Sequence, residues 1–155
     1  MVHIRQAQPD DADGISVFLK KLTAIGQRSL PDTADYVLGR YIDHPDVLSC
    51  CLAVSEGGTP LGLQVLVRAS AGNEYGLTQG WGIVGTHIDP DAARQGIGKA
   101  LFTQTRETAR LNGLRFLDAA IGDQNAGGLA YYERMGFETY ATEPGRVRKR
   151  YDVSA

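Results

Sequence analysis

The sequence has 155 residues, of which 43% are hydrophobic and 22% are charged, proportions typical of a globular protein. This length fits one domain, residues 1–155, and allows a core that buries roughly 70% of the unfolded chain's surface without disulfide or metal supports. A net charge of −2 argues against general nucleic-acid binding, which needs a basic surface. No apolar run of about 18 residues and no basic leader followed by an apolar core occurs, so we expect no membrane segment and a cytoplasmic location.

The first half of the chain predicts a strand, two helices and a hairpin. Residues 2–6 alternate apolar with polar, which is typical of a strand. Pro9 and two acidic residues then begin a helix that ends near Gly26, with apolar residues at helical spacing. A second helix is expected between Pro31 and Pro45. Residues 48–54 and 61–67 predict two strands joined by a turn. The apolar face of the first helix consists of Ile15, Phe18, Leu19 and Leu22.

The second half predicts a β-α-β unit followed by a short helix and two strands. Residues 69–80 read as a loop, and residues 81–88 as a strand in which Gly82 and Gly85 indicate a bulge or a close backbone approach. A helix follows from Gly96 to Leu111, with Ile97, Leu101, Thr108 and Leu111 on its apolar side. A buried parallel strand is expected over residues 114–121. A helix over 126–135 and strands over 137–141 and 147–153 complete a mixed α/β fold.

The cysteines and histidines suggest no special chemistry. Cys50 and Cys51 are neighbours, and neighbouring cysteines rarely reach disulfide geometry. We therefore expect two free thiols that are buried strand residues rather than nucleophiles. His3, His44 and His87 lie about 40 residues apart, which is no metal-ligand spacing. The sequence predicts no metal site.

A glycine-containing turn at residues 88–101 joins a strand to a helix and suggests an anion site. Backbone N–H groups at a helix start have no internal partners and lie at the positive end of the helix dipole, so they can bind a phosphate. Gly96 and Gly98 would remove side chains where phosphate oxygens must come close, and Arg94 and Lys99 could add positive charge. A turn that binds nothing is the alternative.

Two common phosphate motifs fit this turn poorly. A Walker loop requires Ser or Thr after its lysine, whereas Ala100 follows Lys99. A dinucleotide fingerprint requires a third glycine where Leu101 stands, although Asp118 follows Gly98 by about 20 residues, as that fingerprint demands. The dinucleotide alternative therefore stays open, but the turn lies too late in the chain for two nucleotide-binding halves.

Two segments resemble motifs of the GNAT superfamily of N-acetyltransferases. Residues 93–98, Ala-Arg-Gln-Gly-Ile-Gly, are similar to its acyl-CoA pyrophosphate motif [RQ]-x-x-G-x-[GA], with Ala93 as a departure at the first position. Residues 125–137 resemble its signature N-x-x-A-x-x-x-Y-E-x-x-G-F. The order of elements before Trp81 also follows this family, so the resemblance covers most of the chain.

The resemblance implies a fold, a cofactor and its binding residues. It implies a mixed sheet whose middle strands splay apart to admit acetyl-CoA, which would pair with the strand ending at His87 and Ile88 as a further strand. Residues 94–100 would hold the pyrophosphate, and Asn125 would contact the pantetheine. The cofactor-binding residues expected from this are His87, Ile88, Arg94, Gln95, Gly96, Ile97, Gly98, Lys99, Ala100 and Asn125.

The chemistry implied is direct transfer, in which an amine attacks the thioester and the CoA thiolate leaves. Tyr132 matches the family's tyrosine that protonates the departing sulfur, and a phenol remains a proton donor at neutral pH. Tyr131 should pack instead, because neighbouring helix residues face different directions. The general base stays open among His87, Glu74 and Asp118.

The acceptor is the least specified part of the prediction. The resemblance implies that the segment from Gly26 to His44 and the later strands build its pocket, where Asp35, Tyr36 and Tyr41 are candidate lining residues. The cations of the last strand either form a solvated face or recognise an acidic acceptor: Arg146, Arg148, Lys149 and Arg150.

The sequence thus predicts an acetyl-CoA-dependent N-acetyltransferase. Its expected acceptor is a primary amine of a small molecule or an amino-acid-like compound. The alternatives are a protein N-acetyltransferase and a CoA-binding sensor without turnover. A homodimer is expected only from the resemblance.

Overall fold

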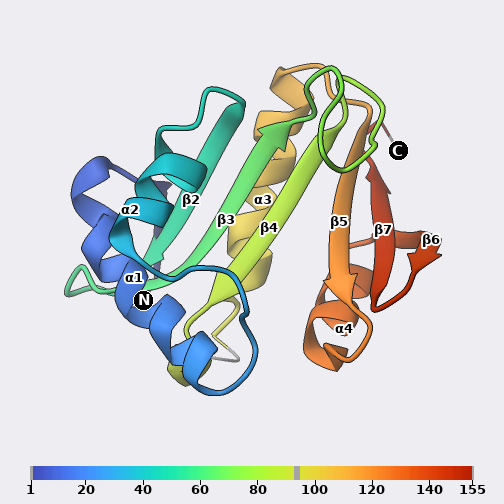
Figure 1. Cartoon of the computed structure of the whole chain (residues 1–155). Coiled ribbons are helices and arrows are strands. Elements are labelled where there is room, and N and C mark those ends of the chain that lie inside the picture. The colour runs from blue at the N-terminus through green and yellow to red at the C-terminus, as the bar shows by residue number, and fades with distance from the viewer. Residues whose placement is uncertain (1, 93–94, 155) are drawn as a thin grey trace.

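The computed structural model describes residues 2–92 and 95–154. Its strands lie in one mixed sheet, with α1 and α2 on one face and α3 on the other, as Figure 1 shows. The strands are β1 (His3–Gln6), β2 (Val47–Val54), β3 (Pro60–Arg68), β4 (Gly82–Ile88), β5 (Phe116–Gly122), β6 (Glu138–Glu143) and β7 (Arg146–Asp152). The helices are α1 (Ala12–Ala24), α2 (Ala34–Val37), α3 (Ile97–Leu111) and α4 (Ala126–Arg134), with 3₁₀ turns at Pro9–Asp11 and Pro90–Ala92 and a π-helical turn at Leu38–Ile42.

The middle of the sheet opens between β4 and β5. The strand order is β1-β2-β3-β4-β5-β7-β6, and β4–β5 is its parallel pair. Among the described residues this pair joins only Gly82 to Leu117 and Ile83 to Asp118, so the two strands then diverge (Figure 1). Every other neighbouring pair runs antiparallel. The predicted fold class and the predicted splay are confirmed.

The first half of the core forms as its sequence pattern predicts. Ile15, Phe18, Leu19 and Leu22 are buried on α1 and pack against the β2–β3 hairpin. Their spacing places them on one face of the helix, and that face covers one side of the sheet. The second predicted helix is shorter than expected: α2 is capped by Thr33 Oγ1, which accepts a hydrogen bond of 3.2 Å from the Tyr36 amide, and continues as the π-helical turn.

The buried face of α3 differs from the prediction near its end. Leu111 was expected on the apolar side of the helix, but it is 70% exposed to solvent. The buried positions instead follow Leu101 through Thr105 to Ala109, a spacing of one helical turn each. The prediction relied on the large apolar side chain of Leu111. In the structure the small Ala109 packs in the core against the sheet, and Leu111 projects into water.

Gly82 marks a close approach rather than a bulge. The register of β3 with β4 runs without interruption from Gly62–Ile88 to Arg68–Gly82, so the first of the two alternatives at Gly82 and Gly85, a bulge, is absent from this part of the described chain. A Cβ at Gly82 would lie 2.5 Å from Leu117 Cδ2 and 2.9 Å from Leu66 Cδ1. Glycine therefore makes room for the leucine side chains that pack over β4 where it pairs with β5.

Both cysteines are free and buried on β2, as predicted. Burial raises the pKa of Cys50 to about 12 and the pKa of Cys51 above its ordinary value. Their thiols stay protonated at neutral pH and are not activated nucleophiles. Across the described residues, no helix has the length and apolarity needed to cross a bilayer, and no cluster of His, Cys, Asp and Glu is arranged to hold a metal ion.

Candidate active site

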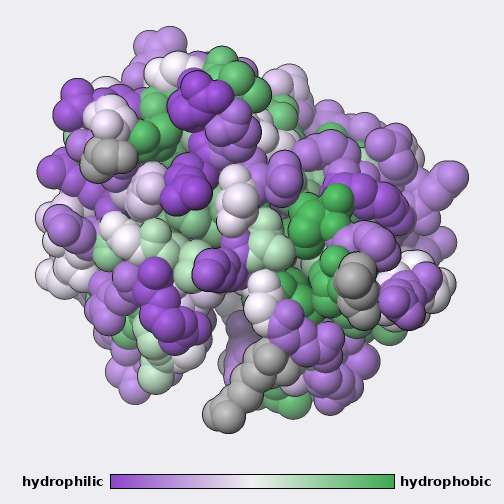
Figure 2. Space-filling view, turned by 180° about the vertical axis from the view of Figure 1, so that it is seen from behind, coloured by the Kyte–Doolittle hydropathy of each residue, from purple (hydrophilic) through white to green (hydrophobic). Residues whose placement is uncertain are grey.

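A cavity of about 830 Å³ occupies the opening between β4 and β5. Its walls come from the end of α1 and the loop after it, the second half of β4, the end of β5, the start of α4 and Gly145. Figure 2 shows the opening from behind as a notch at the lower edge of the molecule, between two lobes. Among the predicted site residues, the cavity brings together His87, Ile88, Asn125 and Tyr132.

One wall of the cavity is a strand edge with unpaired backbone groups. β4 is bonded to β3 along its whole length, but toward β5 its described pairing ends at Ile83. From Val84 to Ile88, the backbone groups that point toward β5 have no strand to pair with. Such an edge can accept an extended ligand through main-chain hydrogen bonds.

The start of α3 offers the second feature of a CoA site. Gly96 is its N-cap with φ +72°, and no side chain caps the helix. The first-turn amides, including those of Ile97, Gly98 and Lys99, have no intrahelical acceptor, and this described turn contains no acidic residue. Gln95, Gly96 and Lys99 are exposed. These features suit a diphosphate; Ala93 and Arg94 lie outside the described residues, so their expected contribution stays a prediction.

The two glycines of this turn have different structural roles. At Gly96, a Cβ would meet nothing within 4 Å, and the positive φ explains the glycine. At Gly98, a Cβ would lie 2.5 Å from Cε1 of Tyr131. Glycine at 98 therefore makes room for the Tyr131 ring, and its expected role in admitting the pyrophosphate stays a prediction.

The Tyr132 hydroxyl is one end of a polar network that crosses the opening. Tyr132 is buried on α4, and its hydroxyl is 2.8 Å from Thr86 Oγ1 on β4. Gln64 Nε2 donates hydrogen bonds of 3.0 Å both to Thr86 Oγ1 and to the Tyr131 hydroxyl. The Tyr131 hydroxyl in turn donates to the Gly98 carbonyl over 2.7 Å. Tyr131 packs as predicted, and it also ties α4 to the start of α3.

Burial keeps the Tyr132 phenol protonated. Desolvation disfavours the phenolate, and the nearby Tyr131 and Asp118 add to this effect, so the pKa of Tyr132 is well above its ordinary value. The hydroxyl therefore holds a proton at every pH at which enzymes normally work. This is the state that a general acid needs before transfer.

Asn125 has a structural partner at the start of α4. Its Oδ1 accepts a hydrogen bond of 3.0 Å from the Gly128 amide, so it caps the helix. Asn125 also lines the cavity. Its expected contact with the cofactor stays a prediction.

His87 is held as a neutral imidazole with a fixed tautomer. Its ring stacks on Tyr41 with 5.5 Å between centroids, and its Nδ1 lies 3.4 Å from Nη1 of Arg28. A guanidinium has no acceptor, so Nδ1 accepts and Nε2 carries the proton. Burial and the Arg28 charge lower the pKa of His87 to about 3. In this arrangement His87 has an N–H at Nε2 that can donate and no free lone pair, so it is a poor base.

The low pKa of His87 predicts a pH dependence of stability. The folded pKa of about 3 lies below the ordinary value of 6.5, so the unfolded chain binds the proton first. The contribution of the neutral His87 to the free energy of unfolding is fully present above pH 6.5. It is lost progressively as the pH falls toward 3. Between pH 7 and 5, we expect His87 to account for a loss of about 1 to 2 kcal/mol in the free energy of unfolding.

Urea unfolding of the wild type, His87→Asn and His3→Asn at pH 7 and pH 5 checks this. The exposed His3 serves as control. His87→Asn should show a smaller pH effect than the wild type, and His3→Asn should match the wild type. Equal pH effects in all three proteins would contradict the structural account of His87.

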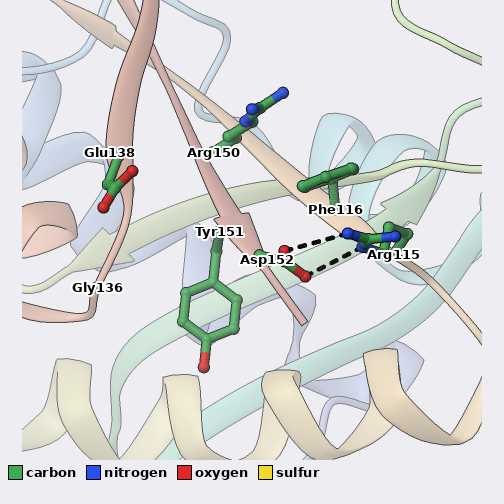
Figure 3. Close-up of a pocket in the computed structure, with 7 residues that line it drawn as sticks. All are labelled: Arg115, Phe116, Gly136, Glu138, Arg150, Tyr151 and Asp152. Atoms are coloured by element: carbon green, nitrogen blue, oxygen red, sulfur yellow. Dashed lines mark hydrogen bonds and ion pairs between the residues drawn. The ribbon is translucent and has the colours of Figure 1, made fainter. Parts of the chain in front are cut away.

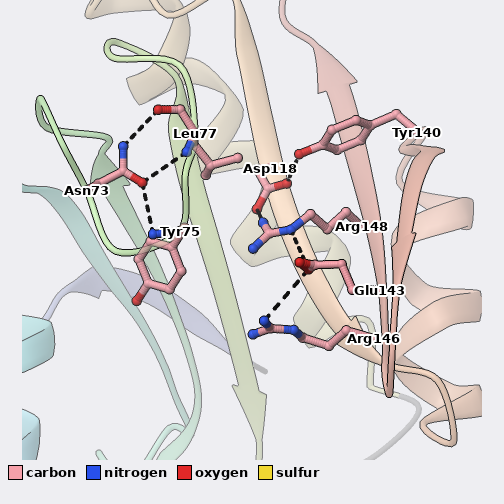
Figure 4. A network of polar contacts seen from close by, with 8 residues as sticks. All are labelled: Asn73, Tyr75, Leu77, Asp118, Tyr140, Glu143, Arg146 and Arg148. Atoms are coloured by element: carbon pink, nitrogen blue, oxygen red, sulfur yellow. Dashed lines mark hydrogen bonds and ion pairs between the residues drawn. The ribbon is translucent and has the colours of Figure 1, made fainter.

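The other two candidate bases lie elsewhere. Glu74 is exposed on the 69–80 loop, and its Oε1 is 3.4 Å from Nη2 of Arg40. Asp118 is buried on β5, where Tyr140 and Arg148 bind its two oxygens (Figure 4). Burial raises the pKa of Asp118, against the opposing effect of these two partners. Neither carboxylate is among the residues that line the cavity.

Two cations of the last strand are buried, which corrects the expectation of a solvated face. Arg148 is 6% exposed and binds Asp118 over 2.8 Å and Glu143 over 2.9 Å. Lys149 is 3% exposed and binds Glu133 over 3.0 Å. Figure 4 shows Arg148 between its two carboxylates, across from the loop that Asn73 orders through its bonds to Tyr75 and Leu77. Arg146 and Arg150 are exposed, as expected.

A second hollow, of about 440 Å³, lies near the end of β7 (Figure 3). It contains the Arg115–Asp152 ion pair of 3.2 Å and Arg150, whose guanidinium lies 4.7 Å from the centre of the Phe116 ring. None of the predicted cofactor residues lines it. Arg150 therefore lies away from the cavity in which the acceptor was expected.

The expected acceptor segment contributes to the cavity mainly through its first residues. Gly26 to Ser29 line the wall, whereas Tyr36 and Tyr41 contact Arg28 and are not lining residues, and Asp35 is exposed. The sequence analysis missed Arg28, Thr86 and Gln64. No local pattern marks any of them, because their partners lie far along the chain.

Comparison with known proteins agrees with this geometry. The model of the Acetyltransferase (GNAT) family matches residues 19–137, which is most of the chain. The chain belongs to this family. Members of this family are N-acetyltransferases that use acetyl-CoA as the acyl donor. The predicted enzyme class and the predicted acyl donor are therefore confirmed.

Individual relatives are more distant. An uncharacterised N-acetyltransferase of Methanocaldococcus jannaschii is 36% identical over 61 residues, which cover 39% of this chain and only 27% of that relative. A GCN5-related N-acetyltransferase from Kribbella flavida has a TM-score of 0.80 at 19% identity, covering 97% of each chain. The Salmonella typhimurium protein yncA, solved with its cofactor acetyl-CoA, has a TM-score of 0.72 at 17% identity over 98% of this chain and 94% of its own. At such identities the structural likeness shows the fold.

Proposed function

We propose that this chain transfers the acetyl group of acetyl-CoA directly to a primary amine of a small molecule. The observation that carries the proposal is the cavity between β4 and β5, in which an unpaired strand edge and the protonated Tyr132 meet. We also propose that residues 1–155 act as one domain. A cytoplasmic location and a homodimer stay predictions.

The residues present fit acetyl-CoA, which supplies an activated acetyl thioester. The free edge of β4 from Val84 to Ile88 would bind the amides of the pantetheine. The first-turn amides of α3 would bind the pyrophosphate, with the exposed Lys99 beside them. Asn125 would contact the cofactor from the opposite wall.

Tyr132 would act as the general acid. The amine nitrogen forms a bond to the acetyl carbon, the carbon–sulfur bond breaks, and the Tyr132 hydroxyl gives its proton to the sulfur. Thr86 would orient that hydroxyl by donating its own proton to the Tyr132 oxygen while its Oγ1 accepts from Gln64, which leaves the phenol proton for the sulfur. The phenolate can then regain a proton from water.

We assign no side chain as the base that deprotonates the amine. The three candidates do not present a free basic group to the cavity, because His87 carries its proton on Nε2 while Arg28 occupies Nδ1, Glu74 is exposed, and Asp118 is bound. Water is the remaining proton acceptor. The rate should therefore rise with pH as the acceptor amine itself loses its proton.

The cavity between β4 and β5 would also suit a second function, that of a CoA-binding sensor without turnover. One assay separates the two: purified protein is incubated with acetyl-CoA and a panel of amines, and free thiol is followed against a no-amine control. We expect thiol release that depends on particular amines and rises between pH 7 and pH 9. Binding of acetyl-CoA without release on any amine would favour the sensor.

A further inference from the structure

A buried arginine lies in the wall of the cavity. Arg28, in the loop after α1, is 8% exposed and lines the opening. Its Nε and Nη2 donate to the Pro31 carbonyl over 3.3 and 2.7 Å, and Nη2 also donates to the Tyr41 hydroxyl over 3.0 Å. Its Nη1 donates to His87 Nδ1 over 3.4 Å. Four of its five N–H groups thus have neutral acceptors.

Two aromatic rings fix the position of this guanidinium. The Arg28 carbon Cζ lies 5.8 Å from the centre of the Tyr36 ring and 5.8 Å from the centre of the Tyr41 ring. The two rings meet edge to face at 5.6 Å. Such contacts favour a cation and restrict its rotamers before any ligand arrives.

Arg28 has no acidic partner among the described residues. Two buried carboxylates of the sheet region pair with other cations: Asp89 with Lys21 over 3.0 Å, and Asp118 with Arg148 over 2.8 Å. Asp123, which lines the same cavity, is exposed to water. A buried cation is costly unless an anion neutralises it. The chain therefore places a preorganised, uncompensated positive charge in the wall of its cavity, with one Nη1 hydrogen unused by the described residues.

His87 adds a second donor on the same wall. Arg28 fixes the proton of His87 on Nε2, and this nitrogen lies on the side of Gly85, where a Cβ would be 3.7 Å away. Both Gly85 and His87 line the cavity. Arg28 and His87 thus line the same cavity, one with a charged donor and one with a neutral donor, and a carboxylate has two oxygens to accept from them.

We propose that Arg28 and His87 bind a carboxylate of the acceptor, so that the substrate is a small amino acid whose amine is acetylated. This inference rests on the proposed function and names its substrate class. The α-carboxylate fits because it neutralises Arg28 and anchors the amine in the same cavity as Tyr132. Amines without an anionic group should be poor substrates, since they leave the buried charge unpaired.

The test compares each L-amino acid with its α-carboxamide as acceptor, in the wild type and in Arg28→Gln. For the best acceptor, the wild type should prefer the acid over the amide at least tenfold in kcat/KM, and Arg28→Gln should lose that preference through a higher KM. Arg40→Gln is the matched control, because Arg40 also lies 5.8 Å from the Tyr36 ring but is exposed and paired with Glu74. It should keep the wild-type preference.

A binding measurement keeps this inference separate from catalysis. N-acetyl amino acids and their carboxamides are titrated into each protein in the presence of CoA, which needs no turnover. Tighter binding of the acids by the wild type, lost in Arg28→Gln with folding confirmed by circular dichroism, supports the inference even if no amine is acetylated.

Three results would overturn the inference while leaving the proposed function intact: acids and amides used equally, neutral amines as the best acceptors, or an Arg28→Gln defect that falls equally on acids and amides. A defect of Arg28→Gln confined to acetyl-CoA affinity would instead assign Arg28 to the cofactor and would equally overturn it. If neither acids nor amides bind, the inference fails as well.

Discussion

Replacing Tyr132 with phenylalanine should lower kcat about 10²- to 10³-fold while leaving the dissociation constant of acetyl-CoA within about threefold of the wild type. The phenol holds its proton because burial raises its pKa, so removing the hydroxyl removes the proton donor for the departing sulfur. The ring stays in place against Phe137, with 5.0 Å between centroids. The loss should therefore fall on kcat rather than on binding.

Stability should change little in Tyr132→Phe. Thr86 keeps its hydrogen bond from Gln64, so the variant loses one buried hydrogen bond, worth about 1 kcal/mol. Tyr151→Phe is the matched control, because Tyr151 packs on Phe137 with 5.4 Å between centroids and lies outside the cavity. Steady-state kinetics and calorimetry on both variants provide the check. A Tyr132→Phe protein as fast as wild type would show that the sulfur leaves without this acid.

Reversing the charge at Lys99 should weaken acetyl-CoA binding about 10- to 100-fold without unfolding the protein. Lys99 is exposed in the first turn of α3. A glutamate there would repel a diphosphate at close range, yet it would favour the helix itself, because an acidic side chain at the positive end of the dipole stabilises by about 0.3 to 1 kcal/mol. Affinity and stability should thus move in opposite directions.

Arg106→Glu is the control for Lys99→Glu, since it makes the same charge change on an exposed position of the same helix, away from its first turn. Its acetyl-CoA affinity should stay close to the wild type. Calorimetric titration and thermal melts of the two variants measure both quantities. Equal affinity losses in the two variants would indicate a general charge effect and would contradict a pyrophosphate site at the start of α3.

Local patterns predicted the elements well because those elements are stabilised by near neighbours in sequence. The β2–β3 hairpin, the apolar face of α1 and the end of the following long helix at Leu111 were all predicted from short spacings. The motifs of the second half were similarly local. They led to the family, the fold class and the segments that border the cavity.

Features that depend on distant partners could not be predicted. Arg148 looked solvated because its partner Asp118 is 30 residues away, and the packing of the Tyr131 ring over Gly98 could not be predicted because these residues are 33 apart. No sequence motif marks Arg28 as a site residue. Its role can be inferred only in the folded protein, where Tyr41 and His87 lie beside it and no carboxylate pairs with it among the described residues. Whether a charged side chain finds an oppositely charged partner depends on the whole fold, and a short sequence segment does not show it.

The central claim is that the opening between β4 and β5 holds acetyl-CoA with its pyrophosphate on the first turn of α3. The most direct measurement is calorimetric titration of the wild type with acetyl-CoA and, separately, with acetyl-S-pantetheine, which lacks the pyrophosphate. We expect a 1:1 complex with acetyl-CoA that is at least tenfold tighter than the complex with acetyl-S-pantetheine. Equal affinities, or no heat with either compound, would contradict it.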